Sequence, residues 1–254
     1  MTALAILDPL KFNELKDIDF NITKKNEKIF KSPPSENKKN LISFKNVFFK
    51  YDKSNKNTLN NIDLDIYKKE FLGVIGKTGS GKSTFINLIL GLLYPSEGNI
   101  SLSYLKAGFV PQSPYLIDDT IKNNIALGVD EKKINLELVK KCIKIVQLEK
   151  FMDSQVNGLD SVVGEKGARI SGGELQRLAL ARALYIEPDI IILDEPTSSL
   201  DEITEKKILD ILKELSKKMT IIVVTHNFDN LQYCDRVVKL ENNLVSLINI
   251  KNKA

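Results

Sequence analysis

The segment GKTGSGKST, residues 76–84, constrains the fold more than any other part of this chain. It lies between the apolar run FLGVIG and the helical pattern STFINLILGLLY, so a strand, a glycine turn and a helix follow one another. Glycines in such a turn let backbone N–H groups curl around phosphate oxygens, and the positive end of the helix completes the cradle. We therefore predict a phosphate-binding loop, named the phosphate loop below, formed by Gly76, Lys77, Thr78, Gly79, Ser80, Gly81, Lys82, Ser83 and Thr84.

Two members of the phosphate loop carry side chains suited to a nucleotide. Lys82 supplies a mobile positive charge for the phosphates, and Ser83 offers a hydroxyl to Mg²⁺. A chance glycine loop with a surface lysine is a poor explanation, because the motif falls between a strand and a helix, where a phosphate-binding loop must lie.

Continuous apolar runs that end in polar residues are typical of strands covered on both faces, as in a parallel sheet between helices. IIILDE (190–195) and TIIVVTH (220–226) are such runs, and a helical pattern at 204–218 separates them. Earlier in the chain, LISFKNVFFKY (41–51) and NNIDLDIY (60–67) alternate apolar and polar residues, as half-buried strands do. These patterns predict an α/β fold with a parallel sheet.

The middle of the chain, about 114–186, has mainly helical patterns, which indicates a helical lobe set into the α/β core. RVVKLENNLVSLI is typical of a closing hairpin with Asn242 and Asn243 at its turn. Residues 1–40 are rich in Lys and Asn, with Pro33 and Pro34 among them, and are expected to form a linker or an arm. The main domain is expected at 41–254.

Composition argues against several classes of protein. The net charge of +4 is mild and the lysines are scattered among acids, so no nucleic-acid partner is expected. No run approaches the roughly 18 apolar residues of a transmembrane helix, and the start MTALAILDPLKFNEL lacks the basic region of a signal peptide, so we expect neither. Cys142 and Cys234 lack metal-ligand spacing and are expected to be reduced, half-buried thiols of a cytosolic protein.

Polar residues at strand ends supply catalytic candidates, because ligands bind at the carboxyl ends of parallel strands. Asp194 ends one buried run and can hold Mg²⁺ through a water, and Glu195 follows it as a candidate general base. His226, the only histidine, ends another run and is a candidate contact for the γ-phosphate and the attacking water. Gln112 follows a strand-like run and could sense Mg²⁺ or water. Each is commonplace alone, and the phosphate loop is what makes the set informative.

Two further features belong to the candidate site. Tyr51, at the end of the first predicted strand, could stack on a base, although ordinary edge packing would produce the same pattern. The stretch ARISGGELQR places Ser171, Gly172, Gly173 and Glu174 before a strongly helical run, which makes a second helix start shaped for phosphate. We expect Glu174 to cap this helix rather than to face phosphate.

Together these motifs resemble the nucleotide-binding domain of ABC transporters, over about residues 41–248 and in family order. The matches are the A-loop at Tyr51, Walker A at 76–84, the Q-loop at Gln112, the signature at 170–174 (ISGGE, where the family has LSGGQ), Walker B at 190–195, the D-loop SSLD at 198–201 and the switch histidine at His226. Walker A occurs in many families, but this signature followed by Walker B and a D-loop is specific.

The resemblance implies a P-loop NTPase core with a parallel sheet, an antiparallel β subdomain and an inserted helical subdomain. It implies ATP and Mg²⁺ as ligands, with Tyr51, residues 76–84 and Gln112 at the nucleotide. Ser83, Gln112 and Asp194 would hold the metal, and Glu195 and His226 would be catalytic. The implied partner is a second nucleotide-binding domain in a head-to-tail dimer, reached in trans through Ser171, Gly172, Gly173, Glu174 and the D-loop residue Asp201.

Within the family, the details resemble exporters, in particular flippases of lipid-linked oligosaccharides and related polysaccharide or lipid exporters. LIDDTIKNNIALG and VGEKG (163–167), which resembles the exporter X-loop, carry this likeness. A transmembrane domain, on the same chain or a separate one, is then the second partner, and the chain would lie at the cytoplasmic face of the cell membrane. Pro196 departs from the exporter pattern, and the short segment SEGNISLSYLKAGFVPQ implies a shortened antiparallel subdomain.

Three other classes share some of these motifs. The stand-alone ATPase subunit of an importer would explain Pro196, but it should lack VGEKG. A DNA-repair or chromosome-structure ATPase needs a long coiled coil, and the sequence has no sustained heptads. A non-hydrolysing regulatory module would be expected to lose Glu195 or His226. We therefore expect the ATP-hydrolysing motor domain of an exporter, with the importer subunit as the alternative.

Overall fold

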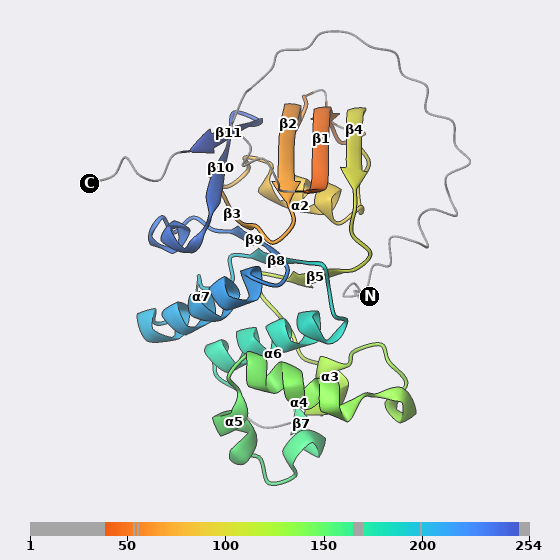
Figure 1. Ribbon diagram of the computed structural model, residues 1–254, viewed down its shortest axis with the longest axis vertical. Coiled ribbons are helices and arrows are strands. Elements are labelled where there is room, and N and C mark those ends of the chain that lie inside the picture. Colours follow the sequence, from red (N-terminus) through yellow and green to blue (C-terminus); the bar gives the residue numbers. More distant parts are fainter. Residues whose placement is uncertain (1–38, 53, 55, 165–169, 199, 249–254) are drawn as a thin grey trace.

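The computed structural model describes residues 39–248 except 53, 55, 165–169 and 199. A six-stranded sheet with the order β11-β10-β3-β9-β8-β5 forms its centre (Figure 1). β11 runs antiparallel to β10, and every other neighbouring pair is parallel, which confirms the predicted parallel sheet. The strands are Phe71–Gly76 (β3), Ala107–Val110 (β5), Ile190–Asp194 (β8), Thr220–Val224 (β9), Arg236–Glu241 (β10) and Leu244–Ile248 (β11).

The central strands separate two hydrophobic cores, which explains their continuous apolar pattern. In β8, Ile191 and Leu193 belong to one core, whereas Ile190 and Ile192 belong to the other. Both sets are fully buried, because successive side chains of a strand point to opposite faces and helices cover each face. The carboxyl ends of these strands are thereby fixed relative to one another.

A three-stranded antiparallel sheet, order β2-β1-β4, covers one side of the core together with helix α2 (Figure 1). Its strands are Asn40–Phe49 (β1), Leu59–Tyr67 (β2) and Glu97–Leu102 (β4), and α2 spans Lys82–Ile89. The rings of Phe44 in β1 and Phe85 in α2 stack with centroids 5.2 Å apart. This sheet is the antiparallel subdomain that the family resemblance implied.

Two boundaries predicted from the sequence are wrong. The helix predicted over 83–94 ends at Ile89, because Gly91 adopts a left-handed backbone with φ of 70° and breaks the helical path. The first strand ends at Phe49, so Tyr51 follows the strand in a turn instead of ending it.

Helices α3 to α6 form a lobe on the side of the six-stranded sheet away from the antiparallel sheet (Figure 1). Sequence patterns did not indicate α5 or the small β6–β7 ladder, which are too short to carry a period. The elements of this part are Asp119–Thr120 (β6), Ile121–Ile125 (α3), Glu131–Lys133 (η1), Leu136–Ile145 (α4), Glu149–Asp153 (α5), Gly158–Asp160 (η2), Val162–Val163 (β7) and Gly172–Tyr185 (α6).

The last part of the described chain contains α7 (Glu202–Ser216), η3 (Asp229–Tyr233) and the β10–β11 hairpin. Asn242 and Asn243 both have positive φ at the hairpin turn, as predicted. None of the helices among the described residues is both long and apolar enough to cross a membrane. Most of the predicted linker, residues 1–38, lies outside the described residues, as does the end of VGEKG, residues 165–167.

The two cysteines are free thiols, as predicted, but they differ in burial. Cys142 is 1% exposed in the core of the helical lobe, so the prediction that it is half-buried is wrong. Burial raises its pKa to about 11 and raises the pKa of the partly exposed Cys234 to about 12. Both thiols are therefore protonated and unreactive at neutral pH.

Candidate functional site

The phosphate loop joins β3 to α2, and its glycines meet two different needs. Gly79 and Gly81 have φ of 79° and 97°, in the left-handed region that glycine adopts at little cost. Gly76 is required by close approach, because a Cβ there would lie 2.4 Å from Ser80 Oγ and 2.6 Å from the carbonyl oxygen of Leu240. The turn predicted from the sequence is therefore present, and it leads directly into α2.

The start of α2 is suited to an anion. Gly81 is its N-cap and no side chain caps the helix, so the first backbone N–H groups have no side-chain acceptor. Among the described residues, Ser80 Oγ is one of three buried side-chain atoms without a hydrogen-bond partner. Open N–H groups and an unsatisfied hydroxyl fit a phosphate group, whose oxygens would accept from both.

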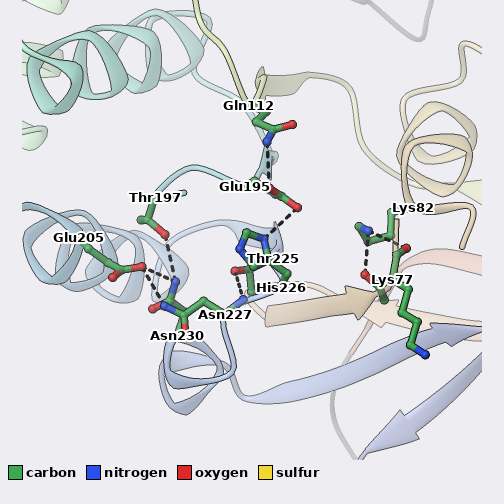
Figure 2. Close-up of polar contacts among 11 residues, drawn as sticks. Lys77, Lys82, Gln112, Glu195, Thr197, Glu205, Thr225, His226, Asn227 and Asn230 are labelled. Atoms are coloured by element: carbon green, nitrogen blue, oxygen red, sulfur yellow. Dashed lines mark hydrogen bonds and ion pairs between the residues drawn. The ribbon is translucent and has the colours of Figure 1, made fainter. Parts of the chain in front are cut away.

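The Lys82 side chain curls back over the phosphate loop. Its Nζ donates to the carbonyl oxygens of Gly76 at 2.8 Å and Lys77 at 3.0 Å (Figure 2). The side chain of Lys77 extends away from this ammonium group. Of the two lysines, Lys82 is thus the one whose charge is held over the loop, with Ser83 and Thr84 following it in the first turn of α2.

Tyr51 lies beside the same helix start. Its hydroxyl shares a hydrogen bond of 3.1 Å with Thr84 Oγ1, and its ring contacts Phe49 edge-on with centroids 4.9 Å apart. The residue is still 46% exposed. Edge packing therefore fixes the ring next to the phosphate loop while leaving surface on which a base could stack.

Three side chains from neighbouring strand ends meet at Glu195. Gln112 follows β5, Glu195 follows β8 and His226 follows β9, and these strands are adjacent in the sheet. Gln112 Nε2 donates to Glu195 Oε2 at 2.9 Å, and His226 Nδ1 lies 3.2 Å from Glu195 Oε1 (Figure 2). The strand order thus brings together the residues that the sequence placed at strand ends.

The backbone at Glu195 is unusual, since its φ of 46° is left-handed for a non-glycine residue. Its N–H donates to the carbonyl oxygen of Val224 at 2.8 Å, which continues the pairing of β8 with β9 beyond the last strand residue. Left-handed conformations of this kind cluster at functional sites, where surrounding contacts hold them. The carboxylate is only 16% exposed and is fixed between its two partners.

The Asp194 carboxyl sits in an environment that favours a cation. Burial raises its pKa, and the neighbouring Glu195 raises it further, while Lys82 acts in the opposite direction. Among the described residues no group of three or more His, Cys, Asp or Glu could hold a metal ion. A hydroxyl, a carboxylate and an amide from Ser83, Asp194 and Gln112 fit Mg²⁺, which commonly takes few protein ligands and completes its shell with water and phosphate oxygens.

The second helix start, ISGGE at 170–174, is closed by its own side chains. Ser171 is the N-cap of α6 and its Oγ accepts from the Glu174 N–H at 3.3 Å. Glu174 Oε2 in turn accepts from the Ser171 N–H at 2.9 Å and from the Ser171 hydroxyl at 2.7 Å. This is a complete capping box, so the prediction that Glu174 caps the helix is confirmed.

The glycines of this second helix start serve packing as well. A Cβ on Gly173 would lie 2.4 Å from Thr204 Cγ2, so α6 approaches α7 closely at this point. Asp201, the last residue of SSLD, is the N-cap of α7 and accepts from the Thr204 N–H at 3.0 Å. Hydrogen bonding to the side chain and then to the backbone of Thr204 lowers the pKa of its carboxyl. Within the described part of the chain, no hydrogen bond or ion pair joins residues 170–174 or Asp201 to the phosphate loop.

A cavity of about 560 Å³ is lined by Glu195 and His226, and also by polar residues that the sequence did not indicate. Glu205, Asn227 and Thr197 contribute to its wall. Each is an ordinary polar residue without a motif of its own, so no sequence signal pointed to them beyond their closeness to the predicted catalytic pair.

Comparison with known proteins adds a family to this geometry. A model of the family described as ABC transporter matches residues 59–198. The chain is 35% identical over 227 residues to an ATP-dependent lipid A-core flippase of Pasteurella multocida, covering 85% of this chain and 39% of that protein. It is 38% identical over 212 residues to the glutathione/L-cysteine transport system ATP-binding/permease protein CydD of Bacillus subtilis, covering 79% and 36%.

A solved structure of a bacterial Atm1-family ABC exporter with ATP bound superimposes with a TM-score of 0.71 at 30% identity. The match covers 81% of this chain and 37% of that one. The chain thus spans under two fifths of the length of these relatives.

Proposed function

Because this chain belongs to the ABC transporter family, we propose that it is the ATP-binding and ATP-hydrolysing motor of an exporter. The observation that carries this proposal is the carboxylate of Glu195, held between Gln112 and His226 at adjacent strand ends. A partly buried carboxylate fixed in this way is suited to act as a general base. Asp194, the preceding residue, lies within electrostatic reach of Lys82, which connects this cluster to the phosphate loop.

Binding of ATP would use groups that the structure already presents. The uncapped start of α2 and the Lys82 ammonium receive the phosphates, and the exposed part of Tyr51 stacks on adenine. Ser83, Asp194 and Gln112 would hold Mg²⁺, which when bound neutralises charge on the phosphates.

In hydrolysis, the oxygen of a water attacks the γ-phosphorus while Glu195 accepts a proton from that water. The bond between the γ-phosphorus and the bridging oxygen breaks, and ADP and phosphate leave. In the present structure both oxygens of Glu195 are engaged, one by Gln112 and one by His226. Because a carboxylate oxygen can accept more than one hydrogen bond, the water can donate to Glu195 beside one of these contacts. Lys82 offsets the charge that develops on the phosphate oxygens.

The second glycine-rich helix start would serve the nucleotide of another copy of the chain. Ser171 and the amides of Gly172 and Gly173 would face the phosphates held by the partner's phosphate loop, so that two ATP molecules lie in a head-to-tail dimer. The position of residues 170–174 on the helical lobe, with no hydrogen bond or ion pair to their own phosphate loop among the described residues, supports a role in trans. Asp201 would lie at the same interface through the turn that precedes α7.

The exporter assignment rests on the relatives, which include a lipid A-core flippase and an Atm1-family ABC exporter. Their greater length fits a transmembrane domain as the second partner, on the same chain or on a separate one. The domain would then work at the cytoplasmic face of the cell membrane, and that membrane domain would select the transported substrate.

ATP hydrolysis by the purified chain at rising protein concentration tests this proposal. A dimeric enzyme should show a rate per chain that increases with concentration, and Glu195→Gln should bind ATP while hydrolysing it at least about 100-fold more slowly. An unchanged rate in Glu195→Gln would exclude Glu195 as the base. A parent chain that binds ATP without hydrolysing it at any concentration would contradict the motor function.

A further inference from the structure

A polar network joins α7 to the two loops that carry the proposed catalytic pair (Figure 2). Glu205 Oε1 accepts from Asn230 Nδ2 at 2.7 Å and from Asn227 Nδ2 at 3.3 Å. Asn230 Nδ2 also donates to Thr197 Oγ1 at 3.0 Å. Asn230 and Thr197 are only 4% and 5% exposed, so the bond between them is shielded from bulk water, where losing a partner is costly. The two bonds to Glu205 are partly buried.

The network reaches the immediate neighbours of Glu195 and His226. Thr197 lies two residues after Glu195, and Asn227 is the residue after His226. The N–H of Asn227 also donates to Thr225 Oγ1 at 3.0 Å, which folds the loop back onto the end of β9. A single carboxylate on a third element thus holds Asn227 and Asn230, and Asn230 in turn connects them to the segment that follows Glu195.

We propose that Glu205 is a positioning residue for ATP hydrolysis: it orders the His226 loop against the segment that follows Glu195, through Asn227 and Asn230. The inference rests on the proposed function, because it assigns Glu205 a part in the same site. His226 is 64% exposed, so its own burial does little to fix it. The loop behind it must supply the order that keeps Nδ1 near Glu195.

Two substitutions can distinguish the hydrogen bonds of Glu205 from its negative charge. One oxygen of Glu205 accepts both amide bonds, so a glutamine whose side-chain oxygen takes that place would keep them without the negative charge. Alanine would remove both. The packing of α7 should survive either change, because buried Ile208 and Leu212 belong to the core and Glu205 does not.

Three variants of the 254-residue chain test the proposal, namely Glu205→Ala, Glu205→Gln and the control Asp210→Ala, which removes an acid from the exposed side of the same helix. Glu205→Ala should lower kcat for ATP at least about tenfold with KM little changed, because misplacement of reacting groups affects the chemical step more than binding. Glu205→Gln and Asp210→Ala should retain the parental kcat.

The single histidine gives a second measurement that does not depend on hydrolysis. With any affinity tag removed, the imidazole NMR signals of the chain belong to His226 alone. In Glu205→Ala they should move toward their positions in Glu195→Ala, where the contact with the base is absent. In Glu205→Gln and Asp210→Ala they should stay at the parental positions.

A parental kcat and unmoved histidine signals in Glu205→Ala would overturn the proposal. It would also be overturned if Glu205→Gln fell as far as Glu205→Ala, since charge and not hydrogen bonding would then be responsible. A parent chain that does not hydrolyse ATP would contradict the proposed function. The histidine signals would still show whether Glu205 positions His226, because they do not depend on hydrolysis.

Discussion

The two glycine-rich helix starts, at α2 and at α6, look alike in the sequence and differ in the structure. α2 begins after Gly81 in a left-handed conformation and has no side-chain cap. α6 begins after Ser171, with a complete capping box in which Glu174 accepts from the N-cap backbone. The start of α2 leaves its backbone N–H groups available to a ligand. At the start of α6, side chains already accept from some of the backbone N–H groups.

The difference shows that glycine content alone does not define a nucleotide site. Around α2 the chain supplies a charge over the loop through Lys82 and an acid, Asp194, at the end of β8, which β9 separates from β3. Around α6 the nearby acid, Glu174, is consumed in capping. The second helix start therefore presents a carboxylate where the first presents an ammonium group, which is the physical reason to regard it as a complement to a site elsewhere.

Removing the Lys82 ammonium group should have the largest effect on ATP binding of the changes at the two helix starts. Lys82→Ala should weaken ATP binding by about 100-fold, since truncating one partner of a charged hydrogen-bonded pair costs about 2–5 kcal/mol. Isothermal titration at low protein concentration measures this, with the exposed Lys68→Ala as the matched control. Affinity within twofold of the parent would refute the assignment of the phosphate loop.

Removing the cap of α6 should have a smaller and different effect. Ser171→Ala should lower the free energy of unfolding by about 1 kcal/mol, the usual cost of losing an N-cap side chain. At low protein concentration it should leave ATP affinity unchanged, because the proposed contact is made to another copy. Denaturant titration and calorimetry check the two halves of this prediction, and an affinity loss comparable to that of Lys82→Ala would show that the two helix starts bind in cis.

The smallest expected effect is on stability, and it comes from Asp194 at the end of β8. Because the folded protein raises the pKa of Asp194, it binds that proton more tightly than the unfolded chain does. Stability is therefore lost as pH rises through the ordinary carboxyl range toward the raised folded pKa, and the deficit stays constant above it. Without nucleotide or metal, Asp194→Asn should unfold at higher denaturant concentration than the parent at pH 7. The difference in unfolding denaturant concentration between variant and parent should narrow toward pH 4. An Asp194→Asn variant less stable than the parent at pH 7 would contradict the raised pKa of Asp194.

Sequence patterns predicted the features of the site that follow from residue type and position within a strand or helix. The strand–turn–helix at residues 76–84 follows from its glycines, and the meeting of Gln112, Glu195 and His226 follows from the rule that ligand groups gather at parallel strand ends. The capping role of Glu174 follows from its spacing to Ser171.

What the sequence did not predict depends on contacts between distant, ordinary residues. The bond of Tyr51 to Thr84 and the network of Glu205 link segments that only the fold brings together. The early end of α2 has a local cause, but a single glycine at position 91 inside a helical pattern is tolerated too often to mark a boundary. The left-handed backbone of Glu195 likewise has no marker, because its residue type normally avoids that conformation.

Mixing two inactive variants tests most directly the claim that the helix starts are halves of one site. Lys82→Ala disables the phosphate loop, and Ser171→Glu places a carboxylate where the partner's phosphates would lie. In a mixed dimer, one site keeps a parental phosphate loop and a parental second helix start, so the mixture should hydrolyse ATP faster than the sum of the separate variants. A mixture that stays at that sum would contradict the shared site.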